Sequence, residues 1–156
     1  MVTHPRLAAA AATAVALGSL IGSATPVASA EVNQIADWLT KAYGPVTTIH
    51  QTEGTVLGAV FAKPPAIDKL QPACKQLDDA KTALQGQLPS PDPKLTVEVQ
   101  QAVDDFESAA DACNSAVKSQ GATQKSDLKS VLSNLQAGEQ HLASADTILG
   151  GITAKS

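Results

Sequence analysis

Apolar residues recur at steps of three and four along the second half of the chain, with polar residues between them. This spacing places the apolar side chains on one face of an α-helix. The chain carries three such stripes in succession: Leu70, Ala73, Cys74, Leu77, Ala80, Leu84 and Leu88; then Leu95, Val99, Ala102, Val103, Phe106, Ala110, Cys113 and Val117; then Leu128, Val131, Leu132, Leu135, Leu142, Ala145 and Leu149. The pattern predicts three amphipathic helices that pack on one another.

Prolines mark the boundary between the first two stripes. Residues 89–93 read Pro-Ser-Pro-Asp-Pro, which ends one helix and begins the next. Asp92 suits the N-cap and Pro93 the first helical position. Pro72 suits a first helical turn.

Glycines mark the other helix ends. The second and third stripes are separated by Gly121 and Thr123. The last stripe is expected to end at Gly150–Gly151, because glycine favours helix termini, and a free tail should begin there.

Residues 31–61 give a weaker pattern of apolar positions. A short amphipathic helix is indicated by Val32, Ile35, Ala36, Leu39 and Ala42. Gly44–Pro45 should break it, since proline removes a helical hydrogen bond. We interpret residues 46–61 as a further helix, with an extended segment as the alternative because threonine and valine favour strands.

Small residues suggest how these helices pack. Gly54, Gly58 and Ala62 fall four apart, which would let another backbone approach closely. Alanine is abundant on the inward faces, and it combines high helix propensity with close helix packing. We therefore expect an all-α fold, a four- or five-helix bundle with a disulfide-linked helical hairpin, and no large preformed cavity.

Residues 1–30 have the three parts of a secretory signal peptide. Met1–Arg6 is a short cationic region, and Leu7–Ile21 is an uncharged apolar run. Ala28 and Ala30 supply the small residues that a signal peptidase requires, so Glu31 becomes the new N-terminus. A membrane anchor is the alternative, but the run is short and alanine-rich for a hydrocarbon layer of about 30 Å.

Cleavage would leave residues 31–156 as a single helical-bundle domain, with its proline-rich turn at 89–93. The domain would carry no stable membrane anchor and would be secreted, either extracellular or associated with the cell envelope. Arg6 is the only arginine, so its removal changes the net charge from −4 to −5. Because nucleic-acid binding relies on cationic patches and arginine forks, no nucleic acid partner is expected.

Cys74 and Cys113 lie on the apolar stripes of two helices that should run antiparallel. Their offsets from the intervening turn are about 21 and 30 Å at 1.5 Å per residue, a difference that an irregular loop can absorb. Two unpaired buried cysteines are the alternative. Export favours a disulfide, because oxidising compartments favour pairing. There is no CxxC redox motif and no ligand set for structural zinc.

The chain resembles a group of small secreted helical proteins of actinobacteria, especially mycobacteria, that have no assigned function. The resemblance is carried by Ala73-Cys74…Leu77…Leu88-Pro89-Ser90-Pro91-Asp92…Phe106…Ala110…Cys113, and by the opening Val32-Asn33-Gln34…Trp38-Leu39. It covers most of the mature chain and implies an exported bundle clamped by a disulfide. It transfers no catalytic residues.

The residues offer little catalytic or cofactor chemistry. Tyr43 and His50 could in principle bind a haem iron, but the few aromatic residues make His50 and His141 more typical of surface histidines. The sequence has no HExxH motif, no G-x-S-x-G motif and no glycine-rich phosphate loop. We therefore expect no metal site, no cofactor and no enzymatic activity.

Two acidic pairs could suggest glycosidase chemistry. Asp78–Asp79 and Asp104–Asp105 are adjacent along helices, so their side chains diverge by about 100°. Facing carboxylates are therefore not expected, and solvated helix faces explain the pairs.

Trp38, in the predicted helix from Val32 to Ala42, has two interpretations. A core position beside Ile35 and Leu39 is favoured, and an exposed contact for a partner or lipid is the alternative.

The function predicted is that of an exported, non-catalytic binding or interaction module with an unknown envelope or extracellular protein partner. The alternative is a carrier that holds a small apolar ligand, lipid or haem, between its helices.

Overall fold

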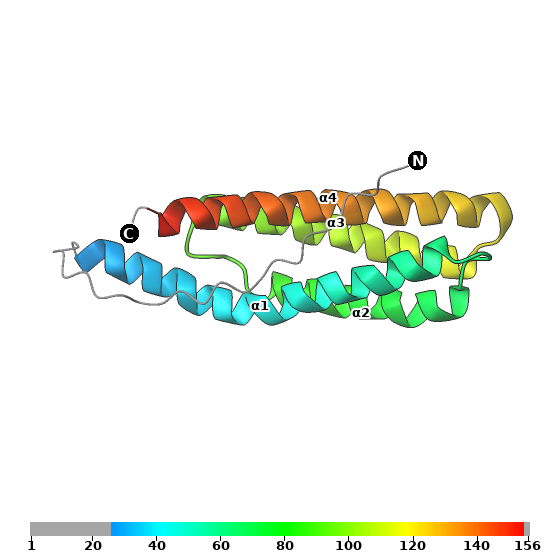
Figure 1. Ribbon diagram of the computed structural model, residues 1–156, viewed down its shortest axis with the longest axis horizontal. Helices are drawn as coiled ribbons and strands as arrows, with labels where there is room; N and C mark the ends of the chain where they lie inside the picture. The colour runs from blue at the N-terminus through cyan, green and yellow to red at the C-terminus, as the bar shows by residue number, and fades with distance from the viewer. Residues whose placement is uncertain (1–25, 155–156) are drawn as a thin grey trace, which may run out of the picture.

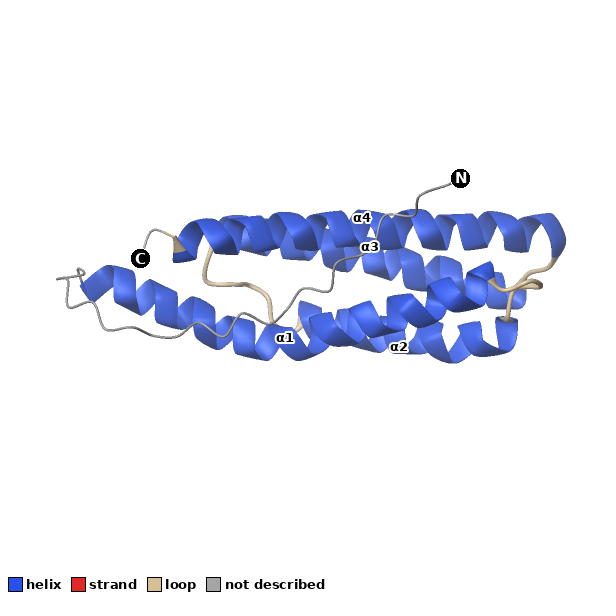
Figure 2. Ribbon diagram, viewed as in Figure 1, coloured by secondary structure: helices blue, strands red, loops and turns tan. Residues whose placement is uncertain are grey.

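The computed structural model describes residues 26–154 as four helices joined by loops, with no strand in this range (Figure 1, Figure 2). The helices are α1 (Pro26–Phe61), α2 (Ile67–Gln85), α3 (Pro93–Lys118) and α4 (Gly121–Thr153). The all-α helical-bundle prediction is therefore confirmed. Most of the predicted signal peptide, residues 1–25, lies outside the described residues, and α1 already begins before the predicted cleavage position after Ala30.

Successive helices run antiparallel and pack side by side, so the bundle alternates in direction around its axis (Figure 1). α3 and α4 contact each other along most of their length, and α1 pairs mainly with α2. α1 and α4 close the bundle but contact each other least. The seam between α1 and α4 is therefore the loosest part of the fold.

The core is built from the three predicted stripes. Phe106 is fully buried and belongs to one apolar cluster that includes residues of all four helices. The stripe residues that are buried are Leu70, Ala73, Cys74, Leu77, Ala80 and Leu84 of α2, Leu95, Val99, Ala102, Val103, Phe106, Ala110 and Cys113 of α3, and Leu128, Val131, Leu135 and Ala145 of α4. The helical periodicity thus identified the inward faces of these three helices.

The predicted break at Gly44–Pro45 is wrong, because α1 continues through both residues. Pro45 lacks an N–H and its ring crowds the carbonyl group four residues earlier, which bends a helix rather than always ending it. Figure 1 shows α1 changing direction where its ribbon turns cyan, at the level of this proline. The helix continues because Ala42 and Ile49, on either side, are both buried in the core.

The sequence contains a feature that indicates this continuity. Ile35, Ala42, Ile49 and Val56 recur at seven-residue steps and are all buried. The repeat keeps its phase across the proline, so a single helix can bury all four residues on one face. An unbroken heptad phase is therefore better evidence for a bent helix than for two separate helices.

Other helix boundaries differ from expectation by a turn or less. α2 begins at Ile67, which places Pro72 in its second turn. α4 runs through Gly150–Gly151 to Thr153, so the predicted end at these glycines and the free tail from Gly151 are wrong. The predicted start of α3 is confirmed, since the Asp92 carboxylate accepts a hydrogen bond of 2.8 Å from the Leu95 amide.

Cys74 and Cys113 form a disulfide with a Cα–Cα distance of 5.6 Å, and both side chains are fully buried. Cys74 lies 11 residues before the end of α2, whereas Cys113 lies 20 residues after the start of α3. α3 therefore extends past the end of α2 by about 13 Å. The loop of residues 86–92 runs along this length, as Figure 1 shows, and absorbs the stagger.

α3 and α4 approach closely at Gly138, which the sequence pattern did not single out. A Cβ at this position would lie 2.6 Å from Cε1 of the buried Phe106 ring. By contrast, a Cβ at Gly54 or Gly58 would meet nothing within 4 Å, and both residues are exposed. The predicted close approach along Gly54 and Gly58 is therefore wrong, and glycine is needed instead where α4 crosses Phe106.

Removing the disulfide should strongly destabilise the fold. Replacing both cysteines with alanine removes a crosslink between positions that are 39 apart in the sequence and so frees the unfolded chain. The chain-entropy model gives a loss of up to about 4 kcal/mol in the free energy of unfolding, measured by urea denaturation. Thiol alkylation of the non-reduced protein should label neither cysteine, and labelling of both would contradict the crosslink.

Gly138→Ala should also destabilise the fold. The new methyl group would overlap a ring that is buried on all sides, at a cost of about 1–3 kcal/mol that exceeds the gain in helix propensity. Gly58→Ala is the matched control, because it should stabilise α1 by up to about 1 kcal/mol. Thermal denaturation that ranks the two variants equally would refute the close contact at Gly138.

Candidate ligand-binding groove

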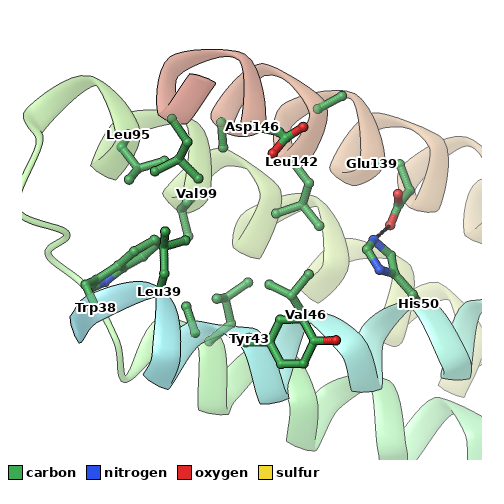
Figure 3. A pocket seen from close by; sticks show the side chains of 15 residues that line it. Trp38, Leu39, Tyr43, Val46, His50, Leu95, Val99, Glu139, Leu142 and Asp146 are labelled. Atoms are coloured by element: carbon green, nitrogen blue, oxygen red, sulfur yellow. Dashed lines mark ion pairs between the residues drawn. The ribbon is translucent and has the colours of Figure 1, made fainter. Parts of the chain in front are cut away.

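A half-open groove with a cavity volume of about 520 Å³ lies along the seam between α1 and α4 (Figure 3). Its residues come from all four helices: Trp38, Leu39, Ala42, Tyr43, Val46 and His50 of α1, Leu84 of α2, Leu95 and Val99 of α3, and Glu139, Leu142, Ala143, Ala145, Asp146 and Leu149 of α4. Most of these side chains are apolar. The size and lining fit the sites that hold small apolar ligands.

The groove has a buried floor and a more exposed rim. Leu84, Leu95 and Val99 are at most 2% exposed and form part of the floor. Tyr43 and Asp146 are exposed at the rim. Leu142 and Leu149, which belong to the predicted core stripe of α4, are only partly buried and form a side wall. Part of the α4 stripe is thus groove wall rather than closed core.

The expectation that inward alanines exclude a large cavity is therefore wrong. α2 ends at Gln85. Near Leu95, the side of α3 that α2 covers elsewhere is therefore covered by the loop of residues 86–92 and not by a helix. In Figure 1 the ribbons of α1 and α4 lie farthest apart near the bend of α1, at the level where α2 ends. Ala42 and Ala145 then contribute to the space, because their short side chains do not cross it.

Trp38 packs against the core, as the favoured interpretation predicts, but its ring is not fully buried. Its indole Nε1 donates a hydrogen bond of 2.6 Å to the backbone carbonyl oxygen of Gln87, in the loop between α2 and α3. The ring is half-buried, packs against the core and lines one end of the groove. Trp38 therefore fixes the loop to α1 while presenting its ring to the cavity.

A polar cluster closes the opposite end of the groove. His50 Nε2 of α1 lies 3.2 Å from Glu139 Oε1 of α4, and Figure 3 shows the two side chains meeting across the seam. This oxygen is buried and accepts no hydrogen bond of good geometry, so the contact is mainly electrostatic. The contact with Glu139 raises the pKa of His50, against the opposing effect of burial.

Glu53, one turn after His50 on α1, belongs to the same cluster. Burial raises its pKa to about 7, and the nearby Glu139 carboxylate adds to the rise. A half-buried carboxyl group beside a second carboxylate is harder to ionise, because the charged form loses hydration and meets like charge. The cluster therefore gains or loses protons near neutral pH.

Tyr43 and His50, the pair considered for haem, both line the groove. Because α1 is continuous, they lie seven residues apart on one helix face, about 10 Å along the axis. Tyr43 is 72% exposed, and His50 is engaged by Glu139. The structure brings the two residues to one cavity, but it places them along its rim rather than deep in an apolar slot.

His141 is only partly exposed and bridges two carboxylates of α3 away from the groove. Its Nδ1 lies 2.9 Å from Glu98 Oε2, and its Nε2 lies 3.7 Å from Asp105 Oδ2. The interpretation of both histidines as plain surface residues therefore misses their role, since each connects α4 to another helix.

The acidic pairs have separate partners, as expected for helix surfaces. Asp79 binds Lys75 at 2.6 Å, and Asp78 lies 3.4 Å from the nearly buried Lys81 amine. Asp104 accepts a hydrogen bond from Gln100, whereas Asp105 faces His141. Neither pair presents two carboxylates to a common site.

Comparisons with models of known protein families, with curated proteins and with solved structures found no match to this chain. Within residues 26–154, no helix is long and apolar enough to cross a membrane. No cluster of three or more potential metal ligands occurs in the same range. The pairing of both cysteines is typical of an oxidising compartment outside the cytoplasm.

Sequence reasoning missed Glu53, Glu139 and Asp146 as site residues. Glu139 follows His50 by 89 positions, and no local motif connects residues on two helices that meet only in the folded bundle. The sequence does place Glu139 and Asp146 seven residues apart, next to the apolar stripe of α4. This spacing predicts that both side chains lie at the edge of the apolar helix face, but it does not predict a groove there.

The polar cluster predicts a pH-dependent stability. Between pH 4.5 and 7 the folded chain holds a proton on Glu53 that the unfolded chain has released, so the free energy of unfolding should fall as pH rises. The raised pKa of His50 acts in the same direction, since its charged contact with Glu139 is lost as pH rises past that pKa. Urea denaturation at pH 5, 6, 7 and 8 measures the slope.

Glu53→Gln should reduce this slope. It removes the cost of ionising a half-buried carboxyl group, so we expect a gain of about 1 kcal/mol at pH 8, after allowing for solvent screening, and little change at pH 4.5. Asp111→Asn, at an exposed position on α3, is the control and should leave the pH dependence unaltered. An equal slope in wild type and Glu53→Gln would contradict the raised pKa.

Proposed function

We propose that this chain is an exported, non-catalytic binding protein of the cell envelope or extracellular space, and that its ligand is a small apolar molecule held in the groove between α1, α3 and α4. The observation that supports this most directly is the half-open cavity of about 520 Å³ with a buried leucine and valine floor. Covering an apolar surface of this kind with an apolar ligand lowers the free energy, because it removes apolar area from water.

Export is supported by the signal-like residues 1–30, by the resemblance to secreted actinobacterial proteins and by the disulfide. A binding rather than catalytic role is supported by the polar groups around the groove. Glu139 and His50 are engaged with each other, and the Trp38 N–H is engaged with the backbone. These contacts leave no nucleophile with an adjacent base in the groove.

A small ligand fits the groove better than a protein partner does. Protein interfaces are broad, and an interface of standard size covers about 800 Å² on each partner. Here the partly buried apolar side chains are gathered around one concavity, with Leu142 and Val46 facing each other across it in Figure 3. A concave site of this size encloses most of a small molecule.

Binding should be visible in the fluorescence of Trp38, the only tryptophan of the chain. A neutral apolar dye, N-phenyl-1-naphthylamine, should bind saturably, with a rise in dye emission and a change in tryptophan emission. Ala145→Phe should weaken binding at least tenfold, because Ala145 lines the cavity and the larger side chain would fill it. Ala122→Phe, at an exposed position at the other end of α4, is the matched control.

Native mass spectrometry of the protein recovered from its source medium complements this titration. It should show the mass of residues 31–156 with an intact disulfide and a bound small molecule. Absence of any bound mass, together with dye binding that Ala145→Phe leaves unchanged, would refute the groove as a ligand site. A stoichiometric protein complex in the same spectrum would favour the protein-partner interpretation instead.

A further inference from the structure

The charged side chains that line the groove include carboxylates but no lysine or arginine. Glu139 and Asp146 lie on the same face of α4, two helical turns apart. His50 is the one basic group of the lining, and its ring is already in contact with Glu139. An amphiphile that enters the groove therefore meets negative charge at the rim and apolar side chains on the floor.

Asp146 is the carboxylate without a partner at this site. It is exposed, and its side chain makes no hydrogen bond or ion pair with the other residues in the range 26–154. Figure 3 shows it on α4 at the edge of the cavity, beside Leu142. The ring of Tyr43, on the opposite rim, is also largely exposed, and an aromatic face attracts cations.

We propose that the natural ligand of the groove is a cationic amphiphile, an apolar molecule carrying one ammonium group, with Asp146 as the partner of the ammonium. This inference rests on the proposed function and specifies the chemical class of its ligand. The apolar part lies on the floor formed by Leu84, Leu95 and Val99, and the charged group stays at the rim. Burial provides most of the affinity, and the carboxylate selects the head group.

Anionic amphiphiles fit the same groove poorly. The carboxylate of a fatty acid, or the propionates of haem, would approach Asp146 and Glu139 without a cation to pair with, and like charges in a partly desolvated site repel. A neutral amphiphile avoids that repulsion but gains nothing from the free carboxylate. The preferred order of head groups is therefore cationic, then neutral, then anionic.

The polar cluster at the end of the groove should make this preference depend on pH. The titratable groups of the groove lining are His50 and Tyr43 on α1 and Glu139 and Asp146 on α4, and the lining residues from α2 and α3 are apolar. Glu53 belongs to the polar cluster with His50 and Glu139. Above about pH 7 Glu53 is ionised, and His50 is neutral above its raised pKa. The cluster is then negative and attracts a cation. Below these values it gains protons and the attraction weakens.

The contribution of the head group to the affinity can be measured with three probes that share a twelve-carbon chain: dodecylammonium, dodecanol and dodecanoate. Each is titrated into the full exported protein at pH 8, below its aggregation threshold, with Trp38 emission and calorimetry as readouts. We expect dodecylammonium to bind about fivefold more tightly than dodecanol, the scale of an exposed ion pair, and dodecanoate to bind most weakly. Lowering the pH to 6 should reduce the affinity for dodecylammonium and leave the affinity for dodecanol unchanged.

Asp146→Asn should remove the preference for ammonium over alcohol while leaving the affinity for dodecanol unchanged. Asp111→Asn is the matched control, because it removes the same charge from an exposed position about 18 Å along α3 from Val99. If Asp111→Asn weakened dodecylammonium as much as Asp146→Asn, the preference would reflect net charge alone and the inference would be wrong.

The two proposals fail in different ways. If none of the three probes bound saturably, the groove would not be a ligand site and the proposed function would fail. If dodecanol or dodecanoate bound as tightly as dodecylammonium, or if added haem bound with a shifted Soret band lost in His50→Ala, the groove would be a ligand site but the cationic class would be wrong.

Discussion

The crosslink between Cys74 and Cys113 sets the register of α2 against α3, and the rest of the bundle follows from that register. Because the two cysteines lie at different distances from the intervening loop, α3 continues past the end of α2. The loop of residues 86–92 must then run lengthwise. Ser90 and Thr96 fix it through hydrogen bonds, and Trp38 binds it through the carbonyl oxygen of Gln87. The end of the bundle beyond α2 thus contains only three helices.

The groove is a consequence of this stagger. A four-helix bundle normally closes its core by packing each helix on two neighbours. Here α1 and α4 contact each other least and lie farthest apart near the bend of α1, where α2 ends, and apolar side chains such as Leu142 and Leu149 stay partly exposed. The close contact between Gly138 and Phe106 keeps α3 and α4 together along the other seam. Because α3 and α4 pack closely and α1 and α4 do not, the cavity lies between α1 and α4.

The loose seam carries a polar contact at one end of the groove. His50 and Glu139 join α1 to α4 and involve Glu53, whose pKa is raised to about 7. The stability of the seam and the charge of the groove therefore depend on the same protons. A binding protein exposed to variable external pH would couple its affinity to its surroundings through such a cluster.

Several features followed from the sequence alone. Helical periodicity identified the inward faces of α2, α3 and α4, because a period of 3.6 residues leaves a direct pattern in the chain. The Asp92 cap and the Pro93 start of α3 were predictable because capping depends on neighbouring residues only. The disulfide was predictable because a segment with the pattern of a signal peptide and two cysteines on apolar helix faces occur in one chain.

Other features were decided only by the tertiary structure. Local rules predicted a break at Gly44–Pro45, but burial of Ala42 and Ile49 on both sides kept α1 continuous. Alanine content predicted a closed core, but a cavity depends on where helices end relative to one another, which no single stripe records. The His50, Glu53 and Glu139 cluster joins side chains 89 positions apart, so it exists only when α1 and α4 meet. Periodicity and capping are local, whereas helix stagger and charge proximity belong to the folded chain.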